Sequence, residues 1–175
     1  MPIPVGDVTC VRAIRSRPTI AALRHQRSNK NGTQHQEEPA SEPQSQIEKV
    51  LANAPFIADL GITLVRFGPD WLETELAIVP RLRQQHGYVH AGVITTLADH
   101  TAGGAASTQI GLEQSVLTAD FTVHLLRPAS GGLLRCRGEV VKGGKRLIVT
   151  QADVWDGDSH CARYLGTMAI VNQAL

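Results

Sequence analysis

Apolar residues recur with a helical period in one central segment of the chain and with a strand period on either side of it. From Val93 to Ala105 apolar and small residues return every three or four positions, which predicts a helix that begins near Ala91 and ends near Thr108. Small residues let a helix lie close against a sheet. This helix holds four of them in a row, Gly103, Gly104, Ala105 and Ala106.

Alternating apolar and polar residues predict strands before and after this helix. Residues 62–67 and 71–78 flank Gly68-Pro69-Asp70, which is typical of a hairpin. Upstream, the apolar spacing of residues 47–54 predicts a short amphipathic helix, followed by a small turn to Leu60. Four further strands are expected at 117–125, 133–141, 146–155 and 163–171.

Successive hairpins predict an antiparallel sheet with one apolar face. The helix from Ala91 to about Thr108 is long and apolar enough to cover that face. We therefore expect an α+β fold in which an antiparallel sheet wraps around one long central helix. The domain should span residues 46–175.

Residues 1–45 differ in composition from the rest of the chain. They are rich in arginine, then polar and acidic, and too poor in apolar residues to build a core. We expect a disordered or loosely attached N-terminal extension. An arginine-containing, acid-poor start also resembles a mitochondrial transit segment, and a misassigned start codon would look the same. Pro18 interrupts any amphipathic helix there, which favours a plain tail.

Composition excludes several partners. The net charge is +1 and aromatic residues make up 4% of the chain, so no basic surface interleaved with stacking residues indicates nucleic acid. Cys10, Cys136 and Cys161 are widely spaced and odd in number, which argues against a disulfide framework and suits a reducing cytoplasm. No apolar run is long enough to span a bilayer, so we expect a cytoplasmic protein without a membrane partner or cofactor.

Candidate chemistry is concentrated between Gln84 and Asp99. Aspartate is a poor helix former, so a carboxylate within a predicted helix is either a solvated side chain or a functional one. This residue, Asp99, follows His90 by nine positions. That spacing places the two side chains on opposite faces of the helix, roughly 13 Å apart along its axis. This also argues against a metal site formed by His86, His90 and Asp99. A second, antiparallel copy of the helix would bring Asp99 to the Gln84–Gly92 turn of its partner, which predicts a site shared across a dimer.

Three motifs carry a resemblance to a known family. They are Gln84-x-x-Gly87-x-x-His90-x-Gly92, then Leu97-Ala98-Asp99, and a later strand that ends in Leu125-Leu126-Arg127-Pro128-Ala129. Over roughly residues 47–171 the chain resembles the hotdog-fold acyl-CoA thioesterases, specifically the phenylacetate-pathway (PaaI-type) branch. The resemblance implies a hotdog fold and hydrolysis of an acyl-CoA to free acid and CoA. We expect at least a homodimer, and a homotetramer built as a dimer of dimers.

The resemblance also implies roles for individual residues. Asp99 would serve as general base or nucleophile, and we favour the general base. Gln84 would orient the substrate or water, and the backbone N–H of Ala91, in the turn that includes Gly92, would polarise the thioester carbonyl. The family commonly shows His-Gly-Gly where this chain has His90-Ala91-Gly92, so the donor remains but the pocket is slightly smaller.

Two further assignments are weaker in the sequence. The family often has a hydroxyl residue at the position of Thr118, but strand alternation places Thr118 on the polar face, away from the helix. His90 is expected to hold the turn through a ring hydrogen bond, with a catalytic role as the alternative. Four basic residues are candidates to bind the phosphates of CoA, and the alternative is that they are ordinary solvated charges. They are Arg127, Lys142, Lys145 and Arg146.

Two rival functions fit the same scaffold. One is an enoyl-CoA hydratase or dehydratase, which usually presents a histidine and an aspartate close together in one loop. The other is a non-catalytic acyl-CoA-binding protein in which Asp99 only caps a pocket. The combination of Gln84 and Asp99 favours the thioesterase.

Overall fold

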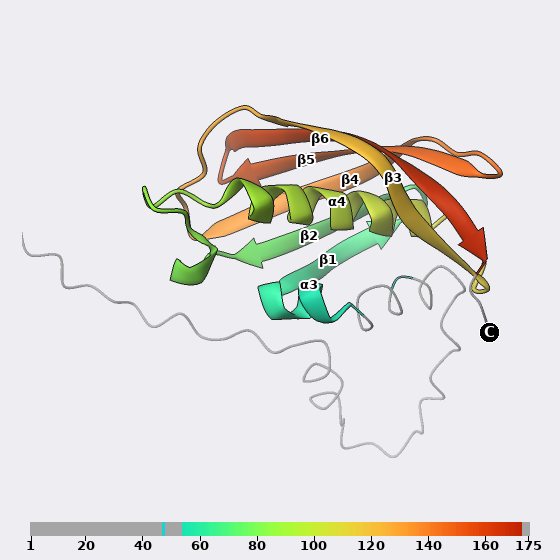
Figure 1. Ribbon diagram of the computed structural model, residues 1–175, viewed down its shortest axis with the longest axis horizontal. Coiled ribbons are helices and arrows are strands. Elements are labelled where there is room, and N and C mark those ends of the chain that lie inside the picture. The colour runs from blue at the N-terminus through green and yellow to red at the C-terminus, as the bar shows by residue number, and fades with distance from the viewer. Residues whose placement is uncertain (1–46, 48–53, 173–175) are drawn as a thin grey trace, which may run out of the picture. The chain divides into compact units, whose positions relative to one another are not determined.

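A computed structural model describes residue 47 and residues 54–172. Within these residues one antiparallel sheet, with strand order β1-β2-β4-β5-β6-β3, curls around the long helix α4 (Ala91–Ser107) (Figure 1). The strands are β1 (Ile62–Gly68), β2 (Trp71–Ala77), β3 (Gln114–Leu125), β4 (Leu133–Lys142), β5 (Leu147–Asp156) and β6 (Ser159–Asn172). The predicted α+β fold, an antiparallel sheet around one helix, is confirmed.

Most predicted elements are present with small shifts in their bounds. The helix from Ala91 and the hairpin of β1 and β2 are confirmed, whereas β6 begins four residues earlier than expected. The turn predicted before Leu60 is instead a six-residue helix, α3 (Pro55–Leu60). Proline at its first position suits a helix start, and Gly61 ends it in the left-handed region with φ 85°. The helix predicted over 47–54 lies outside the described residues except for its two ends: Ile47 is helical and buried, and Ala54 is the N-cap of α3.

Small residues on both surfaces allow α4 to lie close to the sheet, as expected. A Cβ at Gly138 of β4 would come within 2.6 Å of the Thr101 backbone oxygen, and one at Gly104 within 2.8 Å of Leu72 Cδ1. At this contact the buried hydroxyls of Thr74 and Thr101 lie 2.6 Å apart and form a hydrogen bond. Both of these hydroxyl groups, although buried between helix and sheet, are therefore hydrogen-bonded.

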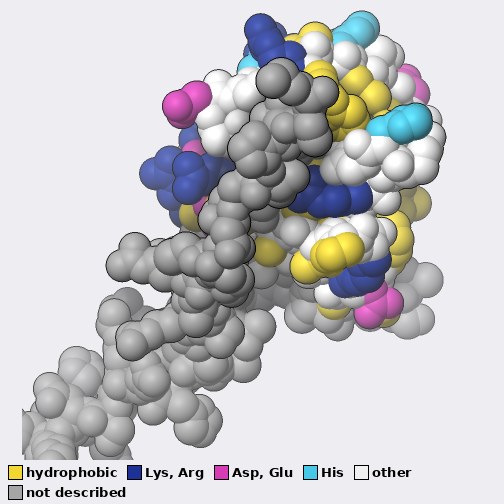
Figure 2. Space-filling view, turned by 90° about the vertical axis from the view of Figure 1, so that its left-hand side faces the viewer, with side chains coloured by type: hydrophobic (Ala, Val, Ile, Leu, Met, Phe, Trp, Pro, Cys, Tyr) yellow, Lys and Arg dark blue, Asp and Glu magenta, His cyan; other side chains and the backbone are white. Residues whose placement is uncertain are grey.

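Strand direction separates two ends of the sheet. One end carries the start of α4, the loop after β3 and the β5–β6 turn; the other carries the β4–β5 turn (Figure 1). Figure 2 faces the first end and shows histidine, Lys or Arg, and hydrophobic side chains exposed together.

No helix in the described part of the chain has the length and hydropathy to cross a membrane.

Two cysteines lie within the described residues, and both are buried free thiols. Burial raises the pKa of Cys136 to about 12, so this thiol is protonated and unreactive near neutral pH. Cys10 and the predicted N-terminal extension, residues 1–45, lie outside the described residues.

Candidate active site

The segment before α4 forms a tight loop stabilised by its own backbone. The Gln84 N–H donates to the Tyr88 oxygen at 2.8 Å, and the Gly87 N–H donates to the Gln84 oxygen at 3.0 Å. Gly87 has φ 85°, a conformation that favours glycine. The Gln84 side-chain oxygen accepts from the His86 N–H, which leaves one oxygen lone pair and the side-chain NH₂ group to contact a ligand.

This loop is anchored to the segment that follows β3. The Arg83 guanidinium donates to the backbone oxygens of Gly87 at 2.7 Å, Ser130 at 3.0 Å and Gly131 at 2.9 Å. The Val89 N–H donates to the oxygen of Ala129, which is fully buried. The two sequence motifs that end at Gly92 and at Ala129 therefore meet in space, and one positions the other.

His90 is the N-cap of α4. Its ring Nδ1 accepts from the Gly92 N–H at 3.0 Å, so the predicted ring hydrogen bond to the turn is present. A neutral ring that accepts at Nδ1 carries its proton on Nε2. The Val93 N–H donates to the His90 oxygen, whereas the Ala91 N–H donates to no described residue. Ala91 thus offers an available donor at the positive end of the helix dipole.

Asp99 lies in the middle of α4 and is half-buried. Its Oδ1 accepts two hydrogen bonds, from Thr118 Oγ1 at 2.9 Å and from the Tyr164 hydroxyl at 2.8 Å. Within the described residues no lysine, arginine or histidine forms an ion pair with Asp99. The carboxylate is thus held by neutral donors on the helix side of the sheet.

The predicted orientation of Thr118 is wrong. Its side chain points toward α4, and its hydroxyl reaches both Asp99 and, at 3.5 Å, Met168 Sδ. The cause is a β-bulge: Thr118 pairs with Met168 and Asp120 with Thr167, so Ala119 is an extra residue in β3. One extra residue exchanges the two faces of a strand, so the alternation counted from Phe121 fails before the bulge.

Tyr164 was missed by the sequence analysis. It lies on β6, is fully buried and reaches Asp99 from the strand next to Thr118. Its position could have given a signal, because a tyrosine on the apolar face of a strand needs a partner for its hydroxyl. Burial, and then the hydrogen bond to Asp99, raise the pKa of Tyr164 well above its ordinary value. The hydroxyl therefore stays protonated and donates at every pH at which the protein would work.

Asp99 and the loop before α4 do not meet within the described chain. No hydrogen bond joins Asp99 to any residue of the Gln84–Gly92 loop. The helical rise separates residues 90 and 99 by roughly 13 Å along the axis. One chain therefore carries an available backbone N–H at the helix start and a carboxylate further along the helix.

The four basic residues considered for CoA do not cluster. Lys142, Lys145 and Arg146 lie at or beside the β4–β5 turn, whereas Arg127 lies at the opposite end of the sheet. There its guanidinium donates to the His160 backbone oxygen at 3.1 Å. A strand the length of β4 spans roughly 30 Å, so the four residues of one chain do not contact one pyrophosphate together.

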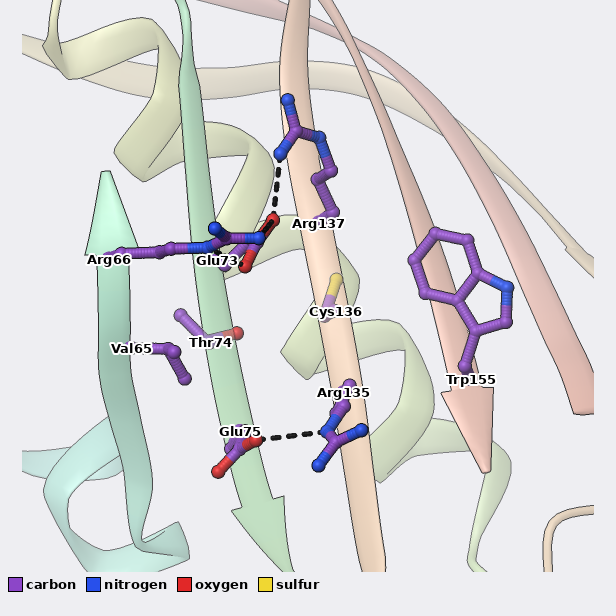
Figure 3. A pocket seen from close by; sticks show the side chains of 9 residues that line it. All are labelled: Val65, Arg66, Glu73, Thr74, Glu75, Arg135, Cys136, Arg137 and Trp155. Atoms are coloured by element: carbon purple, nitrogen blue, oxygen red, sulfur yellow. Dashed lines mark hydrogen bonds and ion pairs between the residues drawn. The ribbon is translucent and has the colours of Figure 1, made fainter. Parts of the chain in front are cut away.

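A hollow of about 490 Å³ lies on the outer face of the sheet, away from α4 (Figure 3). Its charged side chains are paired: Glu73 with Arg66 at 2.6 Å and Arg137 at 2.7 Å, and Glu75 with Arg135 at 3.0 Å. The hydrogen bond from Arg66, aided by Arg137 and opposed by burial, lowers the pKa of Glu73. None of the predicted catalytic residues lines this hollow.

A metal centre is not evident in the part of the chain that the structure describes. Within those residues no group of three or more His, Cys, Asp or Glu side chains is placed to hold a metal ion. His86 and His90 belong to the loop, and Asp99 is bonded to hydroxyl groups instead.

The sheet wrapped around α4 is the arrangement of the hotdog fold, and α4 carries a donor at its start and a carboxylate within it. A family model described as the thioesterase superfamily matches residues 86–162. The structure of a thioesterase family protein from Silicibacter pomeroyi is 32% identical, covers 75% of this chain and 99% of that one, and has a TM-score of 0.72. The chain therefore belongs to the thioesterase superfamily, and the predicted thioester hydrolase is confirmed.

Two further comparisons refine this placement. The structure of Escherichia coli PaaI, from the phenylacetic acid degradation operon, is 18% identical with a TM-score of 0.70, covering 76% of this chain and 96% of that one; it shares the fold. A 1,4-dihydroxy-2-naphthoyl-CoA hydrolase of Listeria monocytogenes is 26% identical over 97 residues, which are 55% of this chain and 79% of that protein. The likeness to PaaI is thus one of fold.

Proposed function

We propose that the protein hydrolyses acyl-CoA thioesters in the cytoplasm, at sites shared between two chains. The observation that carries this proposal is the hydrogen bonding of Asp99, whose Oδ1 is fixed by two neutral hydroxyls, with no cation among the described residues paired to it. A carboxylate held in this way keeps its charge available for attack or proton transfer. The name of the Listeria relative, a CoA-thioester hydrolase, supports CoA as the leaving group.

In the proposed reaction the thioester carbonyl oxygen accepts a hydrogen bond from the Ala91 N–H at the start of α4. Asp99 of the second chain takes a proton from water, and the water oxygen attacks the carbonyl carbon. The tetrahedral intermediate carries its negative charge beside the helix dipole. It then breaks the carbon–sulfur bond, and the CoA thiolate leaves and takes up a proton. Gln84 orients the substrate or the water.

Assembly as a dimer is supported by the edge of the sheet. β3 is the last strand in the sheet order, and within the described residues it pairs with β6 alone. The part of this edge from Leu117 onward exposes Leu117, Phe121 and Leu125, residues that are 59%, 48% and 52% accessible. Long apolar edges are usually covered, and a second copy would cover this one. A tetramer would pair two such dimers.

Two measurements test this function. A panel of aryl, short, medium and long acyl-CoA esters should give free thiol from at least one of them, and binding without thiol release would instead support the acyl-CoA-binding function. A single turnover in ¹⁸O-water separates the two roles of Asp99. As a general base it yields ¹⁸O in the acid product. As a nucleophile it forms an anhydride with the acyl group, and when water opens this anhydride at the aspartate carbon the first acid product carries the unlabelled aspartate oxygen and ¹⁸O enters Asp99.

A further inference from the structure

The side chain of Tyr164 is held in one orientation by its surroundings. A Cβ added at Gly166, two residues along β6 and on the same face, would overlap the tyrosine hydroxyl and lie 2.6 Å from Cζ. On β3, the ring of Phe121 stacks against the tyrosine ring, with centroids 5.5 Å apart and an angle of 21° between the planes. Gly166 leaves room for the ring, and its cross-strand partner Phe121 stacks against it. Its hydroxyl therefore has one direction in which to donate, toward Asp99.

Both hydrogen bonds to Asp99 fall on the same oxygen. Thr118 and Tyr164 donate to Oδ1, and none of the described residues donates to Oδ2. A carboxylate that pivots about its Cβ–Cγ bond presents either oxygen to a reactant, whereas one with Oδ1 fixed from two strands presents Oδ2. The two donors thus distinguish the oxygens of a group that is otherwise symmetric.

A neutral hydroxyl suits this task better than a cation. A guanidinium paired with a carboxylate lowers its pKa, as Arg66 does for Glu73 on the outer face, and thereby weakens it as a base. The Tyr164 hydroxyl orients the carboxylate without neutralising its charge, because burial keeps the phenol protonated.

We propose that Tyr164 is a positioning residue for the hydrolysis reaction, which fixes Asp99 through Oδ1 and leaves Oδ2 as the oxygen that reacts. The proposal rests on the role of Asp99 given under Proposed function. Gly166 contributes to this positioning, because any larger side chain there would displace the Tyr164 hydroxyl.

Tyr164→Phe tests the proposal, because it removes the hydroxyl and keeps the ring. We expect kcat to fall about tenfold while KM stays within twofold, since the substrate is bound by other groups and the fall comes from lost orientation. Thr150→Val is the matched control: it removes another buried hydroxyl, which bonds to the Gly166 oxygen and not to Asp99. That variant should lose some thermal stability and keep its kcat.

A comparison in the Asp99→Asn background separates positioning from folding. A residue that acts through Asp99 has no further effect on the residual kcat once that carboxylate is gone, whereas a merely structural residue lowers kcat in both backgrounds. Gly166→Ala provides a second variant that keeps the hydroxyl but moves it, and it should behave like Tyr164→Phe in both backgrounds.

Two results would overturn the inference: an unchanged kcat in Tyr164→Phe, or an equal fall in kcat with and without Asp99. Failure of the proposed function looks different, because Asp99→Asn alone would then retain wild-type turnover. If Asp99→Asn inactivates the enzyme while Tyr164→Phe has no effect, Asp99 keeps its role and Tyr164 loses its own.

Discussion

Carboxylates on the two faces of the sheet have different partners. On the outer face Glu73, Glu75, Glu139 and Asp153 are all paired with arginines, in ion pairs 2.6–3.0 Å long. On the helix side Asp99 is bonded to two hydroxyl groups. The outer carboxylates are paired with cations, whereas the inner one is held by neutral donors, as the proposed role of Asp99 requires. If Asp99 is the catalytic carboxylate, the partner of a carboxylate distinguishes its role better than its burial does.

The largest expected effect comes from changing the inner carboxylate. Asp99→Asn keeps the side-chain volume and the hydrogen bond from Tyr164 but removes the basic group. We expect kcat to fall by at least about a hundredfold, because an amide neither attacks nor accepts the proton. The melting temperature should stay the same or rise, since active-site charges often cost stability. Steady-state kinetics and calorimetry on the purified variant measure both, and near wild-type turnover would remove Asp99 from the mechanism.

The two faces should also lose stability in different pH ranges. On the helix side burial lowers the pKa of His100, against the charge of Asp99, and its Nε2 is buried without a hydrogen-bond partner among the described residues. As pH falls, His100 therefore binds a proton at a higher pH in the unfolded chain than in the folded one. The contribution of neutral His100 to the free energy of unfolding is complete above about pH 6.5. It decreases as pH drops below that value, by up to about 1.4 kcal/mol per pH unit.

Outer-face carboxylates act at lower pH. Their arginine partners lower the pKa values of Glu73 and Glu139, so their contribution persists below pH 5 and is lost as pH falls through their lowered values. Urea unfolding from pH 7.5 down to 3 should show two successive losses of stability, and His100→Gln should remove the first. A loss near pH 6 that is unchanged in His100→Gln would contradict this assignment.

A smaller effect is expected from the matched change on the outer face. Glu73→Gln removes the charge shared by Arg66 and Arg137, and exposed ion pairs contribute little. We expect about 1 kcal/mol less stability in chemical denaturation, with kcat and KM unchanged. The loss should shrink at high salt, because salt screens exposed charges. A fall in kcat comparable to that of Asp99→Asn would show that the two faces are not separate in function.

Local patterns predicted most of the fold. The spacing around Leu97 and Ala98 predicted the central helix, and alternation predicted the strands, because one face of each is buried in the core. The motif residues led to the correct family. The strand order was not predicted, since it depends on pairings between residues far apart in the chain.

The site was predicted less completely, for two physical reasons. Counting residues along a strand does not reveal a bulge, so Thr118 was placed on the wrong face. Contacts between distant strands are also invisible in a single sequence. Tyr164 therefore looked like one more apolar position in a strand, and Arg127 was grouped with the lysines of the opposite end.

The central claim, that Asp99 of one chain acts with the helix start of another, is tested most directly by mixing two inactive variants. Asp99→Asn and Gln84→Ala each damage a different half of the site. If chains exchange randomly into dimers, half of the dimers are mixed and each has one intact site, so the mixture should recover about a quarter of wild-type activity. If each chain instead held its own complete site, the mixture would show only the average of the two variants measured alone, and the shared site would be wrong.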